Sequence, residues 1–152
     1  MPAGGPEKRM RRVLRVLVLM LVALSLNTGP AAATTDKEQA LHQFINEARN
    51  GKGLGNLRLN ERLSKIARTH SAEMANGGKV LYHSCLTCRI DSWDWSIAGE
   101  NVGTAGTIGR VHRLFMQSPS HRANVLRSPF RTVGLGVVAK AGRLWVTQIF
   151  LG

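Results

Sequence analysis

Two histidines and a glutamate are the residues of this sequence that could do chemistry together. His83, Glu100 and His121 each lie in a loop or near the end of a predicted element, where functional side chains tend to occur. Two imidazoles and a carboxylate are a common ligand set for a divalent transition metal with open coordination positions. The same groups could orient a water molecule, with one histidine as general base. Spacing alone leaves a second interpretation open, in which each side chain only satisfies local hydrogen bonds, for example Glu100 with Arg122.

Four helices are expected to position these residues. They are indicated by capping residues that precede apolar residues at helical spacing, such as Thr35 with Glu38 before the first helix. The third helix is expected to turn Leu114 inward, together with its other apolar residues. Ser118 can cap the fourth, because Pro119 then occupies a position that needs no backbone N–H. The first two expected helices follow caps at residues 35 and 60, the third spans residues 107–117, and the fourth follows the cap at residue 118.

The C-terminal part of the chain changes to a strand pattern. Residues 133–139 and 143–150 are rich in β-branched and aromatic residues, and Lys140-Ala141-Gly142 between them predicts a tight turn. Residues 79–98, which hold both cysteines, are expected to be irregular. Helices followed by a hairpin, without alternation of strands and helices, favour helices packed on an antiparallel sheet.

The first 33 residues have the layout of a secretory signal peptide. A basic start is followed by the apolar run Val16–Leu26 and by Ala31-Ala32-Ala33, which has small residues at both key positions of a cleavage site. The apolar run is about half the ~20 residues that a membrane-spanning helix needs, which disfavours an anchor. We therefore predict a signal peptide at 1–33, cleavage near Ala33, a domain at 34–152 without a transmembrane segment, and a secreted product.

The predicted domain is basic. Five of the 21 Lys and Arg and one of the nine Asp and Glu lie in the leader, so the remainder has a formal charge of +8. A basic exported domain should adhere to anionic surfaces such as envelope polymers or lipid headgroups, although the same charge could serve only solubility. Its cations are scattered and aromatic residues are few, which argues against specific nucleic-acid recognition.

The two cysteines, Cys85 and Cys88, form a C-x-x-C pair directly after the first candidate histidine. Export favours a disulfide, which would close a small loop and stiffen the rim of the site. A thioredoxin-like redox motif would need a βαβ setting, which this sequence does not indicate. A zinc site of His83 and both cysteines is a further alternative, with Glu100, His121 or water as fourth ligand.

Five short segments occur in a specific order and spacing: YHS (82–84), GENVG (99–103), FMQSPSHRANVL (115–126), VGLGVV (133–138) and WVTQIF (145–150). In this order they resemble the CAP superfamily (cysteine-rich secretory, antigen 5 and pathogenesis-related proteins, with an SCP-like extracellular domain), particularly its compact bacterial secreted branch. The resemblance extends from about Glu38 to Phe150. It implies an α+β fold, a three-layer α-β-α sandwich with a central antiparallel sheet, and a strand at the segment GENVG.

The resemblance also implies a cleft lined by two histidines and two glutamates, which binds zinc or another divalent cation in some members. By motif match, His83, Glu100 and His121 are three of these four residues. The second glutamate usually lies close to Gln117 or Ser118, where this chain has no acid. Tight metal binding is therefore doubtful, because one charge that would offset the cation is missing, although either residue could ligate through a water.

One more histidine, His70, lies on the apolar stripe of the second expected helix. We interpret it as a core or cleft-edge residue that hydrogen bonds satisfy, rather than as a ligand.

Two functions remain as hypotheses. Resemblance to the family favours an extracellular binding module for a lipid- or sterol-like small molecule or an anionic envelope component. The alternative is a divalent-metal-dependent, peptidase-like hydrolase that uses His83, Glu100 and His121. The sequence contains neither a G-x-S-x-G nor an H-E-x-x-H motif, which weakens the hydrolase hypothesis. A plainer possibility is a secreted scaffold whose cleft residues only hold loops.

Overall fold

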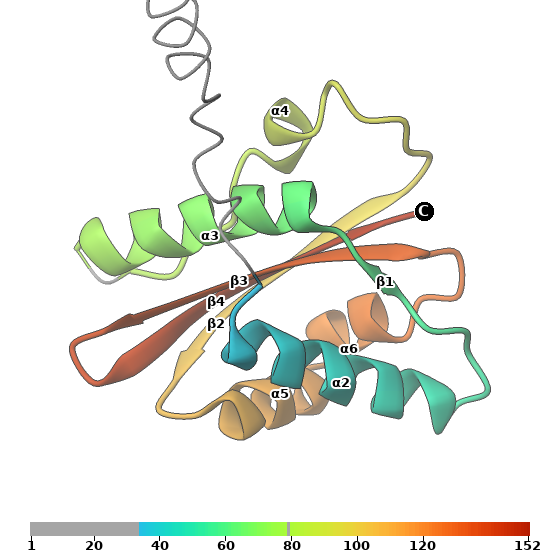
Figure 1. The fold of residues 1–152 in the computed structure, drawn as a ribbon, viewed down its shortest axis with the longest axis horizontal. Coiled ribbons are helices and arrows are strands. Elements are labelled where there is room, and N and C mark those ends of the chain that lie inside the picture. The colour runs from blue at the N-terminus through green and yellow to red at the C-terminus, as the bar shows by residue number, and fades with distance from the viewer. Residues whose placement is uncertain (1–33, 79) are drawn as a thin grey trace, which may run out of the picture. The chain divides into compact units, whose positions relative to one another are not determined.

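The computed structural model describes residues 34–78 and 80–152, so the expected signal peptide lies outside the described residues. Within the described part, no helix is long and apolar enough to cross a membrane. The elements follow in the order α2 (Asp36–Asn50), β1 (Arg58–Leu59), α3 (Glu61–Asn76), α4 (Leu86–Arg89), β2 (Ala98–Ala105), α5 (Ile108–Gln117), α6 (Pro119–Val125), β3 (Thr132–Lys140) and β4 (Arg143–Leu151) (Figure 1).

The helix starts agree with the capping signals of the sequence. The Thr35 side chain accepts from the Glu38 N–H and the Glu38 side chain accepts from the Thr35 N–H, so the predicted capping box is confirmed. Asn60 caps α3 through the backbone N–H of Leu63. Ser118 holds the N-cap position of α6, but its side chain makes no capping hydrogen bond. Pro119 at the first helical position lacks one of the N–H groups that a helix start leaves without partners.

The sheet has the strand order β1-β3-β4-β2. β4 pairs antiparallel with both β3 and β2, which confirms the C-terminal hairpin and the strand at GENVG. Ala141 and Gly142 form the two-residue turn with φ of 50° and 72°, as a type I′ turn requires. The two-residue strand β1 pairs parallel with β3 and was not predicted, because two residues show no periodicity.

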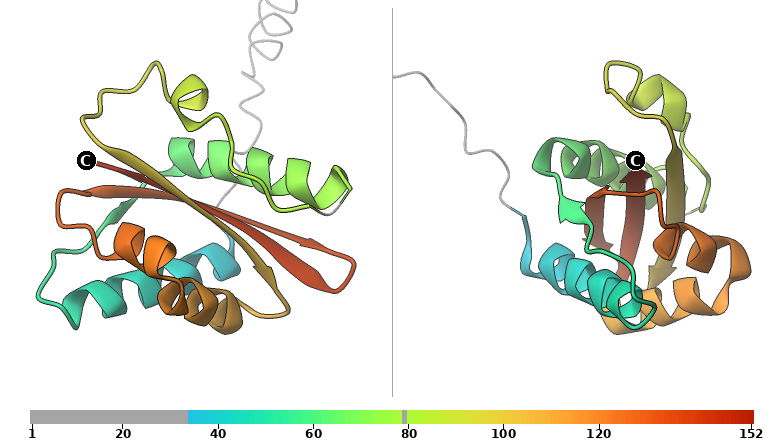
Figure 2. Two further views of the ribbon diagram at one scale, coloured as in Figure 1. Left: turned by 180° about the vertical axis from the view of Figure 1, so that it is seen from behind. Right: turned by 90° about the vertical axis from the view of Figure 1, so that its right-hand side faces the viewer.

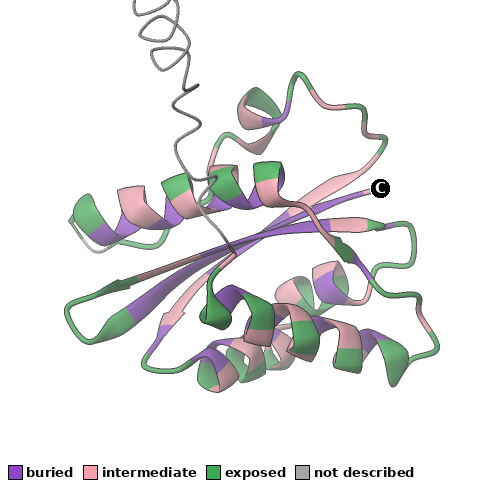
Figure 3. Ribbon diagram, viewed as in Figure 1, coloured by how far each residue is buried: buried purple, intermediate pink, exposed green. Residues whose placement is uncertain are grey.

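Helices cover both faces of this sheet, so the three-layer α-β-α sandwich is confirmed (Figures 1 and 2). Alternate residues of β4 point to opposite layers. Val146 and Phe150 pack in the core of α2, α5 and α6, whereas Ile149 packs against Leu63 and Ala67 of α3. Nearly all of β4 is buried, while the outer faces of the helices are exposed (Figure 3).

Two glycines of β3 allow α3 to lie very close to the sheet. A Cβ on Gly134 would lie 2.5 Å from the backbone carbon of Leu63, and one on Gly136 would lie 2.2 Å from that of Ala67. The neighbouring residues Val133 and Leu135 are fully buried in the core on the opposite face of the sheet. Packing therefore explains the alternation over residues 133–136, with large residues toward one layer and none toward α3, whereas Val138 packs against Met74 and Ala75 further along that helix.

Candidate functional site

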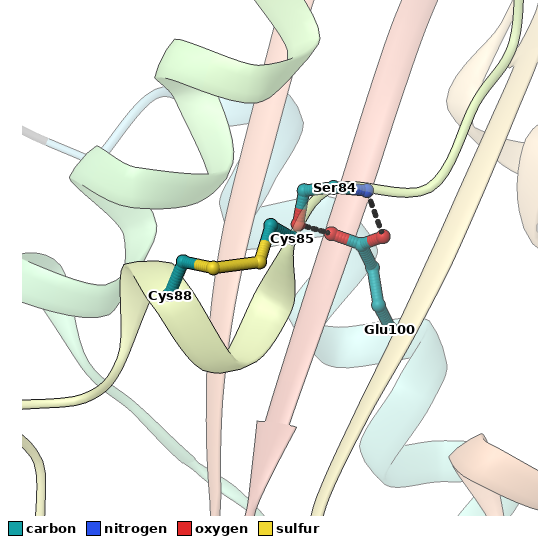
Figure 4. The surroundings of a disulfide bond; sticks show 4 residues. All are labelled: Ser84, Cys85, Cys88 and Glu100. Carbon is teal, nitrogen blue, oxygen red and sulfur yellow. Dashed lines mark hydrogen bonds between the residues drawn. A yellow bond between two sulfur atoms is a disulfide. The ribbon is translucent and has the colours of Figure 1, made fainter.

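The side chain of Glu100 is the centre of a hydrogen-bonded cluster at the edge strand β2. Only 4% of this side chain is exposed. Its Oε1 accepts from the backbone N–H of Ser84 at 2.8 Å, and its Oε2 accepts from the Ser84 hydroxyl at 2.6 Å (Figure 4). The Nδ1 atom of His83 lies 3.0 Å from Oε1. The carboxylate therefore pins the segment that contains His83 and Ser84 onto the edge of the sheet.

This contact with Glu100 determines which nitrogen of the His83 ring carries the proton. A carboxylate only accepts hydrogen bonds, so the hydrogen-bond pattern assigns the proton to Nδ1. In the neutral ring the lone pair then lies on Nε2. The side chain is 61% exposed, so Nε2 is accessible to a substrate or to water.

His121 lies in the first turn of α6 and is partly buried. Its ring meets the ring of Phe115 edge to face, with centroids 5.2 Å apart. Burial, and after it the charge of His83, lowers the pKa of His121. The lowered pKa favours the neutral form of His121 at pH 7.

Buried amides hold the start of α6 against β2. Asn101 donates through Nδ2 to the backbone carbonyl of His121 at 3.0 Å and to Oε1 of Gln148 at 2.9 Å. Asn124 of α6 donates to the backbone carbonyl of Glu100 and to Oδ1 of Asn101. Both Asn101 and Gln148 are fully buried. Asn101 and Gln148 were not predicted as positioning residues, because nothing local in the sequence marks a contact between such distant residues.

A buried arginine of α2 holds the other end of α6. Arg49 is 1% exposed. Its guanidinium donates to the backbone carbonyls of Val125 at 2.9 Å and Arg127 at 3.0 Å, and its Nε donates to that of Gly55 at 2.8 Å. Burial, and after it the charge of Arg131, lowers the pKa of Arg49. Hydrogen bonds to these carbonyls offset the desolvation of the buried cation. One of the carbonyls belongs to Val125, the last residue of α6, where a positive charge also interacts favourably with the helix dipole.

An apolar cavity of about 250 Å³ adjoins this cluster. It lies between the second half of β2, helix α5, the start of α6 and the segment around Leu81. Leu114 was predicted to face the core, but it is 44% exposed, because it lines the cavity rather than the core. The lining residues are Leu81, Val102, Gly103, Thr104, Val111, Leu114, Phe115, Ser118 and His121.

The remaining candidate residues occupy different places. Ser118 lines the cavity, whereas Gln117 is exposed at the end of α5 and is not among the lining residues. His70 is fully buried. Its Nε2 lies 2.9 Å from the backbone carbonyl of Tyr82, and its Nδ1 lies 3.3 Å from Oε2 of Glu73. His70 thus connects α3 to the segment that carries His83.

The disulfide between Cys85 and Cys88 is present and spans the single turn of α4 (Figure 4). It begins directly after Ser84, so it constrains the segment that binds Glu100. Neither sulfur is a free thiolate in this state. The alternatives that need thiolates, a zinc site or a reduced redox motif, do not describe this form of the protein.

The arrangement of donors provides a test of the expected metal site. Two imidazoles and a carboxylate suit zinc by their chemistry. However, both oxygens of Glu100 already accept hydrogen bonds, and Nδ1 of His83 faces one of them. Among residues 34–78 and 80–152, no three His, Cys, Asp or Glu side chains are grouped closely enough to hold an ion. The residues as arranged do not fit a bound ion, and we derive no reaction step through one.

Comparison with known proteins identifies the family to which this chain belongs. The model of the CAP family, the cysteine-rich secretory protein family, matches residues 42–150. The chain belongs to this family.

Relatives and solved structures agree with this assignment. The Bacillus subtilis protein YkwD is 29% identical over 132 residues, which cover 82% of this chain and 51% of YkwD, so the chain spans about half the length of that relative. An extracellular SCP-domain protein from Bacillus anthracis has 25% identity and a TM-score of 0.65, with coverage of 74% of this chain and 39% of that chain. An outer surface protein from Borrelia burgdorferi shares the fold with 18% identity and a TM-score of 0.70, with coverage of 78% and 94%.

Proposed function

We propose that the protein is an exported binding module whose cavity takes the apolar part of a small hydrophobic ligand or of an envelope component. The observation that carries this proposal is the lining of the cavity, in which leucine, valine and phenylalanine side chains surround a partly buried imidazole. A concave apolar site with few polar groups is the usual form of a small-molecule site.

The size of the cavity limits what it binds. Its volume of about 250 Å³ is below the roughly 300–1,000 Å³ of pockets that enclose a drug-sized ligand. A short acyl chain or one apolar ring system fits this volume, and the rest of a larger ligand stays outside. His121 and Ser118 provide polar groups for the portion of the ligand that reaches them.

A variant that fills the cavity tests this function. Thr104→Trp places a large side chain into the cavity from a strand position, where aromatic residues are well tolerated. The probe is anilinonaphthalene sulfonate (ANS), whose fluorescence reports an apolar site, with decanoate as competitor. We expect binding to the wild type and loss of binding to this variant.

The matched control is Thr69→Trp, which adds the same bulk at an exposed position of α3. This control should bind the probe like the wild type. Equal binding by all three proteins would disprove the cavity as the site.

Hydrolysis is the second candidate, and the Glu100–His83 contact is the observation that favours it. A buried carboxylate that orients an imidazole through Nδ1 leaves Nε2 to remove a proton from water. Ser84 is poorly suited as a nucleophile, because its hydroxyl is donated to Glu100.

Activity measurements would separate the two candidates. A hydrolase of this type would lose its activity in His83→Ala and would keep it in the presence of a chelator. The same substitution should leave ANS binding in the cavity largely intact.

Export is part of the proposal and rests on the pattern of residues 1–33. Mass spectrometry of the protein recovered outside an exporting host shows where its N-terminus lies and so tests export and cleavage. A mature N-terminus near Ala33 would support export with cleavage. Retention of the whole leader would contradict it.

A further inference from the structure

The large apolar side chains that are exposed on the described part of the protein belong to the segment 80–82 and to Leu114. Among the described residues they are Val80, Leu81, Tyr82 and Leu114. Leu81 and Leu114 both line the cavity, and the other two flank Leu81 in the sequence. The exposed fractions are 61% for Val80 and 42–44% for the others. We call these four residues the apolar rim. An exposed apolar cluster around a cavity is typical of an interaction site.

The segment that forms most of the cavity wall carries only positive charges. From Asn101 to the C-terminus the sequence contains seven Lys and Arg and no Asp or Glu. This segment includes α5, α6 and most of β2, which form the greater part of the cavity wall. A surface with apolar residues and uncompensated cations matches an anionic interface rather than a neutral apolar partner.

Three arginines lie beside the cavity. Arg110 and Arg113 are exposed on α5, respectively one turn before Leu114 and next to it. The Nε of Arg143 donates to Oγ1 of Thr104, a residue of the cavity wall, at 3.3 Å. These cations occupy the same region as the apolar rim, so an anionic surface meets both at once.

Acidic residues on the remaining side do not cancel this charge. Glu100 is buried and bonded to His83 and Ser84. Glu73 is paired with Arg89 at 2.6 Å. Asp91 and Asp94 precede the start of β2, whereas the cavity lies along its second half.

We infer that the apolar rim docks on the surface of an anionic lipid bilayer, with Val80, Leu81, Tyr82 and Leu114 at headgroup depth and Arg110, Arg113 and Arg143 on lipid phosphates. Tyrosine suits this depth, because its ring is apolar and its hydroxyl remains hydrated. Docking in this orientation turns the mouth of the cavity to the membrane. If the cavity binds a hydrophobic ligand, as proposed above, that ligand would come from the bilayer, and this consequence rests on the proposed function. The docking itself does not depend on the proposed function.

Vesicle flotation tests the docking. The protein is purified from an exporting host, with its N-terminus determined by mass, and mixed with vesicles of phosphatidylcholine alone or with equal phosphatidylglycerol. We expect flotation only with phosphatidylglycerol. In Arg110→Gln/Arg113→Gln the partition coefficient should fall about 25-fold, since each cation near an anionic surface contributes about fivefold. Leu81→Ser/Leu114→Ser should also reduce flotation, and the remaining binding should disappear in high salt.

The matched control is Lys52→Gln/Lys65→Gln, which removes the same charge at two exposed positions, one in the turn after α2 and one on α3. It should retain flotation within about threefold, because charges more than about 10 Å from the membrane are screened. Equal losses in the two charge variants would overturn the inference, because binding would then depend on total charge alone. Binding to soluble polyphosphate without flotation would overturn it as well.

Thr104→Trp separates this inference from the proposed function. This variant fills the cavity and removes the Thr104 contact of Arg143, but it leaves the apolar rim, Arg110 and Arg113 in place. It should therefore still float with phosphatidylglycerol, with a partition coefficient at most about fivefold lower than that of the wild type, and fail to bind ANS. Normal ANS binding by a protein that does not float would leave the binding function intact and refute the docking.

Discussion

Ser84 donates two hydrogen bonds to the carboxylate of Glu100, one from its backbone N–H at 2.8 Å and one from its hydroxyl at 2.6 Å. The two residues are 16 positions apart, and the carboxylate is almost fully buried. Because both oxygens are engaged, this pair fixes where the segment around His83 crosses the edge of the sheet. The site therefore depends on a serine that carries no obvious chemical role of its own.

Replacement of Ser84 should weaken the fold measurably. Ser84→Ala removes one donor from a buried carboxylate, which costs about 1–3 kcal/mol of the free energy of unfolding. Urea denaturation measures this loss. The control is Ser92→Ala at an exposed position of the loop, where we expect no change. Equal stability of both variants would show that water replaces the hydroxyl without cost.

Titration of His121 should depend on His83. Burial and the charge of His83 both lower the pKa of His121 from its ordinary value of 6.5. His83→Gln removes the second cause, so the midpoint should move upward but stay below 6.5, because the ring remains partly buried. NMR of the imidazole Hε1 protons measures it. His42→Gln on α2 is the control and should leave His121 unchanged.

The same depressed pKa determines the sign of a pH effect on stability. The unfolded chain binds a proton on His121 at higher pH than the folded chain does, so this group stabilises the fold above pH 6.5. That contribution is lost as the pH falls below 6.5 through the lowered pKa. Burial also lowers the pKa of His112, which adds an effect of the same sign. Unfolding at pH 7 and pH 5 should show a smaller difference in His83→Gln than in the wild type.

Arg49 should be among the positions least tolerant of substitution. Arg49→Met leaves several backbone carbonyls without donors, and each unsatisfied buried group costs about 1–3 kcal/mol. We expect a loss of at least about 3 kcal/mol in urea denaturation, together with weaker ANS binding, because α6 loses the contact at its end. Arg58→Met removes an exposed arginine and should be nearly neutral. A stable Arg49→Met variant would mean that α6 is held without this cation.

The disulfide should stabilise the protein only modestly. Cys85 and Cys88 are three positions apart. In the chain-entropy model, closing so small a loop contributes about 2 kcal/mol. Cys85→Ser/Cys88→Ser should therefore remain folded, with about this loss of stability, and should no longer respond to dithiothreitol. A much larger loss would show that the native contacts of α4 require the bridge.

Local signals account for the part of the fold that was predicted from the sequence. Thr35 and Asn60 cap their helices within three residues, and the Ala141-Gly142 turn connects neighbouring strands. The strand β2 was different, because Gly99 and Gly103 have low strand propensity; only the resemblance to the family indicated it. Its pairing with the buried β4 supplies the stability that propensity lacks.

The candidate site was predicted less completely, because its contacts join distant parts of the chain. Motif resemblance indicated His83, Glu100 and His121, but not that Ser84 would engage both oxygens of the carboxylate. The contact between Arg49 and the carbonyl of Val125 spans 76 positions. Such contacts depend on the packing of whole layers, and no pattern of neighbouring residues encodes them.

Gly134 and Gly136 of β3 also influence the position of the cavity entrance, although they do not line the cavity. Since Gly134 and Gly136 present no side chains, the depth of α3 is determined by direct contact between its backbone and the strand. His70 on α3 holds the carbonyl of Tyr82, whose neighbour Leu81 stands at the mouth of the cavity. The two glycines thus allow the shortest possible distance between α3 and the sheet. Any side chain added at either position would push α3 away from the sheet and move the cavity entrance outward with it.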